Sequence, residues 1–167
     1  MKTLLIHPPY SHLFQWAKGN VVINMPLSLP SLSAYLKREG HEVSILDLNI
    51  KMYLDAKEAY KGLWHEKNYN IWRGDRSLFL NEVLLKLRGI QEKWVDVILK
   101  SNSKIIGFHV SSVSRWMALS LAKKLKERNR EIVIVFGGPE CFKEKLEELF
   151  GTGCVDAVVT GEGEVTF

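Results

Sequence analysis

The sequence predicts an α/β fold in which helices cover both faces of a five-stranded parallel sheet. Short apolar runs rich in Val and Ile alternate along the chain with amphipathic segments of helical period. Strands that are apolar along their whole length are typical of parallel sheets buried on both faces. Turns of Gly, Ser and Pro follow most of these runs, as expected where a strand passes into a crossover helix. We therefore expect a flavodoxin-like (Rossmann-like) sheet with the strand order 2-1-3-4-5.

The first part of the chain supplies two strands and a helix. Residues 3–6 (TLLI) form a short buried strand, which the following prolines end because proline cannot donate to a strand ladder. Residues 10–27 are predicted to be a long loop. Residues 31–39 are predicted to be a helix, since leucines recur on one face and Gly40 supplies the stop. The second strand is EVSIL, residues 42–46.

Residues 50–100 interrupt the alternation. Leucine and valine recur at helical spacing from Leu80 onward, and the spacing continues beyond Gly89. The preceding segment, residues 53–76, is rich in Tyr and Trp without a clear period. We interpret this block as two or three helices inserted between the second and third strands, within a single domain of residues 1–167.

The alternation resumes in the second half. Residues 103–110 (SKIIGFHV) form a strand, and residues 114–128 a helix whose basic C-terminal end suits the helix dipole. The fourth strand is EIVIVF, residues 131–136. A short helical face around Leu146 follows, and residues 155–160 (VDAVVT) are the fifth strand.

Composition excludes several classes of protein. The 167 residues are 46% hydrophobic and 25% charged, the balance of a soluble domain with its own core. The net charge is +4, but Lys and Arg alternate with Glu along helices, which favours solvated faces over a nucleic-acid surface. No apolar run approaches the ~20 residues of a membrane span or forms a signal peptide. Cys141 and Cys154 lack metal-ligand spacing, so we expect reduced thiols in a cytoplasmic protein.

A ligand site is expected at the carboxyl edge of the sheet, where parallel strands bring their C-terminal ends together. Four turns would meet there: residues 7–10, 111–114, 137–140 and 161–164. Three of them consist of small residues, which let a ligand approach the backbone. One such turn is best explained as a turn alone, but three on one edge favour a ligand. Neither G-x-G-x-x-G after the first strand nor a P-loop pattern is present, which argues against a dinucleotide or a P-loop nucleotide.

Five segments carry a family resemblance: LLIHPPY, PLSLPSLSAYLKREGHEVSILDLN, IIGFHVSS, IVFGGPE and VDAVVTGEGE. They extend from residue 3 to residue 164, apart from the insert. In these segments the chain resembles the N-terminal cobalamin (vitamin B12)-binding domain of B12-dependent radical SAM enzymes, such as the anaerobic magnesium-protoporphyrin monomethyl ester cyclase. The resemblance implies that the corrin rests over the strand ends and that the nucleotide tail threads beside the sheet.

The resemblance also implies which residues hold the cofactor. Small residues after the third and fourth strands make room for the tail, and the corrin lies near the Pro-Pro-Tyr loop and the Ser-Ser-Val turn. The candidate cofactor-binding residues are Pro8, Pro9, Tyr10, Ser111, Ser112, Val113, Gly137, Gly138, Pro139, Gly161, Glu162 and Gly163. None is expected to be catalytic.

The chain departs from the cobalamin domains of mutases and methionine synthase at the axial ligand. Those domains carry Asp-x-His-x-x-Gly after the first strand, where residues 7–12 are His-Pro-Pro-Tyr-Ser-His. The lower cobalt ligand therefore cannot be carried over. His12 could ligate cobalt, but a solvated loop histidine is the interpretation we favour, and no firm metal ligand is predicted.

Some of the remaining residues keep two interpretations. Tyr10 and Trp16 either cover an edge of the corrin or pack into the core. His109, inside the third strand, is predicted to be a packed core residue. Glu162 is assigned a structural hydrogen bond, in preference to a catalytic pair with Glu164.

The resemblance further implies a larger parent enzyme. In the family a barrel with Cys-x-x-x-Cys-x-x-Cys follows, and its [4Fe–4S] cluster cleaves S-adenosylmethionine. The present chain would then be a non-catalytic cobalamin module, cut at a domain boundary. Its partner would be the C-terminal radical SAM domain of a methyltransferase, cyclase or oxidoreductase.

Two alternatives remain open. One is a flavodoxin-like module for a flavin or nucleotide. The other is a domain that has lost its cofactor and serves substrate recognition or interdomain contact. A sheet edge filled by Tyr10, Trp16 or side chains of the insert would favour the second alternative.

Overall fold

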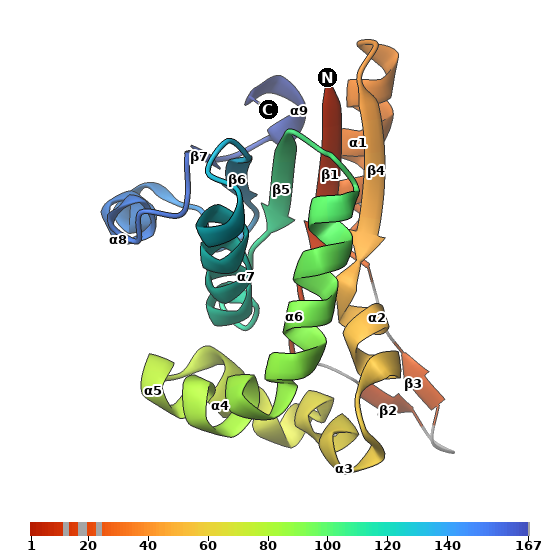
Figure 1. The fold of residues 1–167 in the computed structure, drawn as a ribbon, viewed down its shortest axis with the longest axis vertical. Coiled ribbons are helices and arrows are strands. Elements are labelled where there is room, and N and C mark those ends of the chain that lie inside the picture. The colour runs from red at the N-terminus through yellow and green to blue at the C-terminus, as the bar shows by residue number, and fades with distance from the viewer. Residues whose placement is uncertain (12–13, 17–19, 23–24, 167) are drawn as a thin grey trace.

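The computed structural model describes residues 1–11, 14–16, 20–22 and 25–166 (Figure 1). At its centre lies a sheet of five strands, all parallel: β1 (Lys2–His7), β4 (Glu42–Asp47), β5 (Ile105–His109), β6 (Val133–Gly137) and β7 (Ala157–Val159). The spatial order is β4-β1-β5-β6-β7, which is the order 2-1-3-4-5. The predicted flavodoxin-like α/β fold is therefore confirmed.

The strand register gathers the expected site at one edge. His7 pairs with Asp47, and the preceding residue, Ile6, pairs with Phe108. Gly137 lies between His109 on one side and Val159 on the other. The last residues of all five strands consequently form one row, and the turns that follow them begin from this row.

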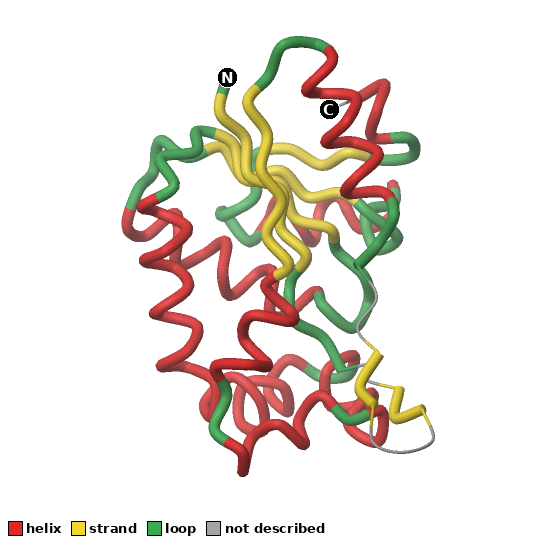
Figure 2. The backbone as a smooth tube through the Cα atoms, turned by 90° about the vertical axis from the view of Figure 1, so that its right-hand side faces the viewer, coloured by secondary structure: helices red, strands yellow, loops and turns green. Residues whose placement is uncertain are grey.

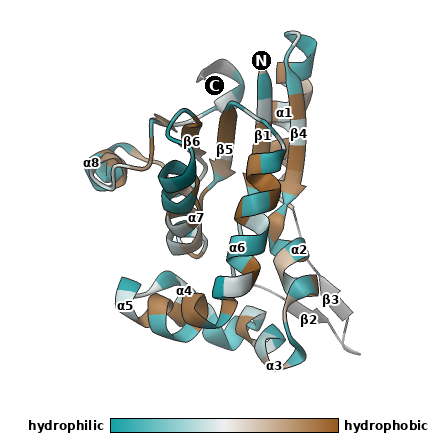
Figure 3. Ribbon diagram, in the orientation of Figure 1, coloured by the Kyte–Doolittle hydropathy of each residue, from teal (hydrophilic) through white to brown (hydrophobic). Residues whose placement is uncertain are grey.

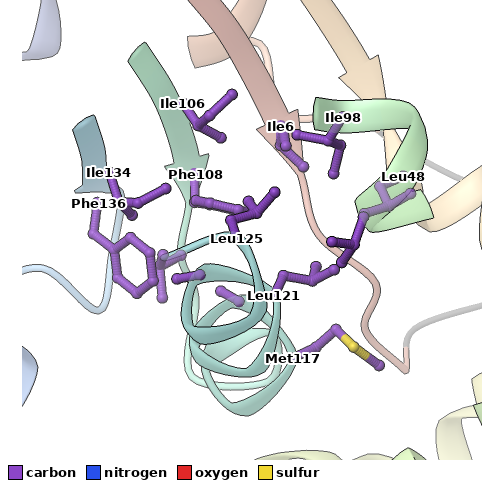
Figure 4. Close-up of a cluster of buried hydrophobic side chains, with 14 of the residues drawn as sticks. Ile6, Leu48, Ile98, Ile106, Phe108, Met117, Leu121, Leu125, Ile134 and Phe136 are labelled. Atoms are coloured by element: carbon purple, nitrogen blue, oxygen red, sulfur yellow. The ribbon is translucent and has the colours of Figure 1, made fainter. Parts of the chain in front are cut away.

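Helices cover the two faces of the sheet unequally. The front face packs against α6 (Leu85–Lys100) and α7 (Arg115–Arg128), as Figure 1 shows. Figure 4 shows its core, where Phe108 and Phe136 point toward Leu121 and Leu125 of α7. The back face packs against α1 (Ser28–Arg38), which covers β1 and β4 in a smaller cluster. Apolar strands between amphipathic helices explain the colouring of Figure 3, in which β4 and β5 are largely brown.

Helix α1 begins and ends where its sequence dictates. It starts at Ser28, three residues before the predicted start, because Pro30 is tolerated in a first helical turn. At its other end Gly40 has a φ of +84°. The backbone N–H groups of Gly40 and His41 donate to the carbonyls of Lys37 (3.1 Å) and Leu36 (3.0 Å), which is the Schellman motif.

The insert contains more pieces than the two or three helices predicted. They are α2 (Leu48–Asp55), α3 (Glu58–Lys61), η1 (Gly62–Trp64), η2 (Glu66–Asn68), α4 (Tyr69–Arg73), α5 (Arg76–Phe79) and a π-helical turn, η3 (Leu80–Leu84), that continues into α6. Its large aromatic side chains, Trp64, Trp72 and Phe79, are fully buried and belong to the same cluster as the front face of the sheet. The aromatic richness that obscured the helical period is thus core packing.

Residues 10–27 are not a simple loop, contrary to the prediction. β2 (Phe14–Trp16) and β3 (Asn20–Val22) pair as antiparallel strands, apart from the main sheet (Figure 2). Each has only three residues, which is too short for an alternating pattern to be detected in the sequence.

The C-terminal part alternates as predicted, with shorter elements. After β6 come a single turn, η4 (Lys143–Lys145), and α8 (Leu146–Gly151), and after β7 comes α9 (Gly163–Thr166). Across the described ranges, no helix combines the length and the apolar character needed to cross a bilayer.

Candidate functional site

The back face of the sheet is only half covered, and a groove of about 500 Å³ occupies the uncovered half. Because α1 lies over β1 and β4, the back faces of β5, β6 and β7 are open toward it. We call this space the back groove. Its floor is formed by Leu5, Gly107, His109, Val135, Gly137 and Val159, and its sides by α1 and by the turns after β6 and β7.

The turn after β6 needs glycine at Gly138 for reasons of packing. Its φ is +112°, and a Cβ there would lie 2.8 Å from the carbonyl oxygen of Val110. The turn is held at both ends by the same residue: the Val110 N–H donates to the Gly137 carbonyl (2.6 Å), and the Glu140 N–H donates to the Val110 carbonyl (3.1 Å). Gly138 therefore lets the turn lie against the end of β5.

Gly137 has no such requirement. A Cβ at this position would meet only the Val159 Cβ, at 3.7 Å, an ordinary van der Waals contact. Gly107 on β5, which pairs with Val135 and lies diagonally across from Gly137, also lines the floor of the back groove. The floor therefore carries no side chain at these two positions.

The Gly-Glu-Gly-Glu turn closes the groove from the other side. Gly161 has a φ of +81°, which turns the chain after β7 back toward α1. The Ser31 hydroxyl then donates to the Glu164 carboxylate (2.6 Å), so that α9 is joined to α1. That hydrogen bond, with one from its own backbone N–H, lowers the pKa of Glu164. Sequence reasoning gave the structural role to Glu162 and missed this bond of Glu164.

His109 lines the back groove and is only partly buried, contrary to the prediction of a packed core residue. Its Nδ1 lies 3.3 Å from the Ser28 hydroxyl oxygen at the start of α1. Burial, helped by the neighbouring His7, lowers the pKa of His109 to about 4, so the ring is neutral at neutral pH. The alternation of side chains along a strand could have predicted this placement, because His109 must face the same side of the sheet as Gly107 and the opposite side from Phe108.

The loop after β1 lies on the front side of the edge. Pro8 and Pro9 are buried, and the half-buried Tyr10 packs against the main core. The Asn49 side-chain oxygen accepts hydrogen bonds from the Tyr10 N–H (3.2 Å) and from the Trp64 indole (2.7 Å). The insert therefore anchors this loop. His12 and the side chain of Trp16 lie outside the described residues.

The buried His7 and the partly buried Asp47 form a polar pair at the ends of β1 and β4. The His7 Nδ1 lies 3.5 Å from a carboxylate oxygen of Asp47. Burial alone would raise the pKa of Asp47, but hydrogen bonds from His7 and from the Ile50 N–H lower it. Burial and the charge of Asp47 raise the pKa of Tyr10.

The Ser-Ser-Val-Ser turn opens α7. The Ser111 N–H donates to the Ser114 hydroxyl (2.9 Å), and the Ser111 carbonyl accepts from the N–H groups of Ser114 (3.1 Å) and Arg115 (3.0 Å). These bonds, between Ser111 and the first residues of α7, hold the turn closed at the start of the helix.

The twelve candidate cofactor-binding residues thus divide into two equal groups. Six line the back groove: Gly137, Gly138, Pro139, Gly161, Glu162 and Gly163. The other six belong to the turns after β1 and β5: Pro8, Pro9, Tyr10, Ser111, Ser112 and Val113. The sheet brings both groups to its carboxyl edge, the first group toward the back face.

A partly buried ion pair connects the start of α7 to the turn after β6, and the sequence offered no sign of it. The Arg115 guanidinium lies 2.8 Å from the Glu140 carboxylate, and both side chains are 13% exposed. The guanidinium also lies over the Trp116 ring, 4.3 Å from its centre.

Metal-binding groups do not gather anywhere in the described part of the chain. Among those residues no three His, Cys, Asp or Glu side chains are close enough together to hold an ion. Cys141 and Cys154 are buried free thiols. Burial, with the nearby Glu140, raises the pKa of Cys141 to about 12, so it is an unreactive thiol.

Comparison with known proteins finds a methyltransferase-like relative. Over all of its 167 residues the chain is 26% identical to an uncharacterised methyltransferase of Pyrococcus horikoshii. It spans 28% of the length of that protein. No family model and no solved structure matches the chain. The parallel α/β sheet and this methyltransferase-like relative are compatible with a cofactor-binding module.

Proposed function

We propose that the chain is a cobalamin-binding module, which positions the corrin at the carboxyl edge of the sheet for methyl transfer or related radical chemistry. The observation that carries the proposal is the course of the back groove. It starts at the carboxyl edge and continues along the back of β5, β6 and β7 over a floor without side chains at Gly107 and Gly137. Such a space suits a ligand with a broad ring system that stays at the edge of the sheet and a narrow tail whose end enters the groove.

Cobalamin has these two parts, a corrin ring and a nucleotide tail. The heterocyclic base at the end of the tail would enter the back groove against Gly137, Val135 and Val159, while the corrin and the phosphodiester of the tail would lie over the turns at the strand ends. Bound cobalamin would supply the cobalt–carbon chemistry. The chain's own residues would bind the tail, orient the ring and exclude water from the groove.

The open groove supports cofactor binding over a domain that has lost its ligand. The described residues that line it include neither Tyr10 nor a side chain of the insert. A flavin mononucleotide, whose terminal phosphate carries more negative charge than the phosphodiester of cobalamin, fits less well, since no Lys or Arg occurs among the described lining residues.

The methyltransferase-like relative supports a proposal about the reaction of the parent protein. It is named a methyltransferase, and the chain matches just over a quarter of it. We therefore extend the proposal to a parent protein that transfers methyl groups. A radical SAM domain with its [4Fe–4S] cluster and S-adenosylmethionine, implied by the family resemblance, belongs to this proposal as the partner of the module.

The test is retention of hydroxocobalamin through desalting, followed by visible absorption. We expect the wild-type chain to retain the corrin and Gly137→Val to bind it at least about tenfold more weakly, because the added methyl groups enter the groove. Cobinamide lacks the nucleotide tail. The wild type and Gly137→Val should therefore differ much less in how strongly they bind cobinamide. Ser44→Ala, at an exposed position on β4, is the control. Failure of the wild type to retain cobalamin, or equal retention by Gly137→Val, would contradict the proposal.

A further inference from the structure

Two polar side chains of the back groove, from different elements, lie within hydrogen-bond distance of each other. The polar side chains that line it are Ser28, Ser31, His109, Glu162 and Glu164. Ser31 is already bonded to Glu164. Ser28 and His109 come from different elements, α1 and β5, and their side chains meet across the groove wall at 3.3 Å.

Together, the side chains of Ser28 and His109 offer a ligand one uncharged hydrogen-bond donor and one uncharged hydrogen-bond acceptor. Because the pKa of His109 is depressed to about 4, its imidazole carries one N–H at neutral pH. If the Ser28 hydroxyl donates to Nδ1, the Nε2–H remains as a donor and the hydroxyl oxygen as an acceptor. If Nδ1–H donates instead, the hydroxyl is the donor and Nε2 the acceptor. Either tautomer leaves one of each.

The surroundings of the pair disfavour an anion. The start of α1 would be the natural anion site, but two of its amides are engaged: the Leu29 N–H donates to the Pro26 carbonyl (3.2 Å) and the Ser31 N–H to the Leu27 carbonyl (3.1 Å). Pro30 has no N–H to offer. The described lining contains two glutamates and no cation.

We propose that Ser28 and His109 are the specificity-determining pair of the back groove, and that they select a neutral ligand edge of amide or nitrogen-heterocycle type over an anionic one. The inference rests on the proposed function for the groove being a cofactor site, and it states which part of a cofactor the groove accepts. Cobalamin carries both an uncharged heterocycle and amide side chains. A phosphate would remain outside the groove.

The experiment uses benzamide and benzoate, which differ in charge and hardly in shape. The ¹⁵N-labelled chain is titrated with each, and the amide signals of Gly107 and Gly137 report binding. We expect these signals to shift with benzamide and not with benzoate. Ser28→Ala, at an exposed position, and His109→Phe, which keeps a ring without nitrogen, should each bind benzamide about fivefold more weakly, the value of one hydrogen bond. Ser44→Ala should bind as the wild type does.

Three results would overturn the inference: equal binding of benzoate and benzamide, benzamide affinities of both variants within about twofold of the wild type, or no shift at Gly137. Hydroxocobalamin retention by the same proteins separates this inference from the proposed function. Retained cobalamin without benzamide selectivity overturns the inference alone. Benzamide selectivity that depends on Ser28 and His109, without cobalamin retention, overturns the proposed function alone.

Discussion

At the scale of single residues, two adjacent glycines at the end of β6 are glycines for different reasons. Gly138 has a positive φ and no room for a Cβ beside the Val110 carbonyl. Gly137 has an ordinary backbone conformation and room for a Cβ next to Val159. One glycine is therefore required by the fold, whereas the other shapes the back groove.

The two positions should respond differently to alanine. We expect Gly138→Ala to lower the free energy of unfolding by about 2–4 kcal/mol, because it combines an unfavourable φ with a clash against backbone. Gly137→Ala should change it by less than about 1 kcal/mol. Urea denaturation followed by circular dichroism measures both. Similar losses in the two variants would show that the backbone of the turn adapts, contrary to this interpretation.

At the scale of elements, long-range polar contacts hold the edge of the sheet together. Asn49 joins the loop after β1 to Trp64 of the insert. The Arg115–Glu140 pair joins α7 to the turn after β6. Because the turns at the edge are tied to helices on the front face, the groove on the back face has one rigid side.

The Arg115–Glu140 pair should show strong coupling in a double-mutant cycle. Arg115→Met leaves the partly buried Glu140 without this partner, whereas Glu140→Gln leaves Arg115 with the Glu148 carboxylate at 3.7 Å. We therefore expect a loss of about 2–3 kcal/mol for Arg115→Met and of about 1–2 kcal/mol for Glu140→Gln. The double variant should cost about 1–3 kcal/mol less than the sum of the two. The exposed i,i+4 pair Glu82–Lys86 is the matched control, with an expected coupling of about 0.5 kcal/mol or less. Additive losses at Arg115 and Glu140 would contradict a structural role for the pair.

At the scale of the whole molecule, the sequence predicts the sheet well and the groove only in part. Continuous apolar strands such as residues 103–110 are a local signal, and they indicated the class and the strand order that the structure has. The groove depends on how far α1 extends across the back face, which is a tertiary property. The bond between Ser31 and Glu164 spans 133 residues and has no local signature. Turns of small residues indicated Gly137 and Gly161, but not His109, whose role follows from the face it occupies.

The neutral His109 should also affect the stability of the whole chain as pH falls. In the unfolded chain a histidine takes up a proton near pH 6.5, whereas burial delays this in the folded protein until about pH 4. The unfolded state therefore binds more protons between these values, and the free energy of unfolding should decrease as pH is lowered through this window. One proton gives a slope of at most about 1.4 kcal/mol per pH unit. Denaturation of the wild type and of His109→Gln between these two pH values measures the effect.

The variant should have the flatter profile, with the wild-type chain more stable relative to it at neutral pH than at the acidic end of the window. An NMR titration of the His109 ring checks the cause independently, since its midpoint should lie near pH 4. Parallel profiles, or a ring that titrates near pH 6.5, would mean that the ring is solvated in the folded protein. A solvated ring would also weaken the case for a neutral hydrogen-bonding pair in the back groove, so this measurement tests stability and the specificity of the site together.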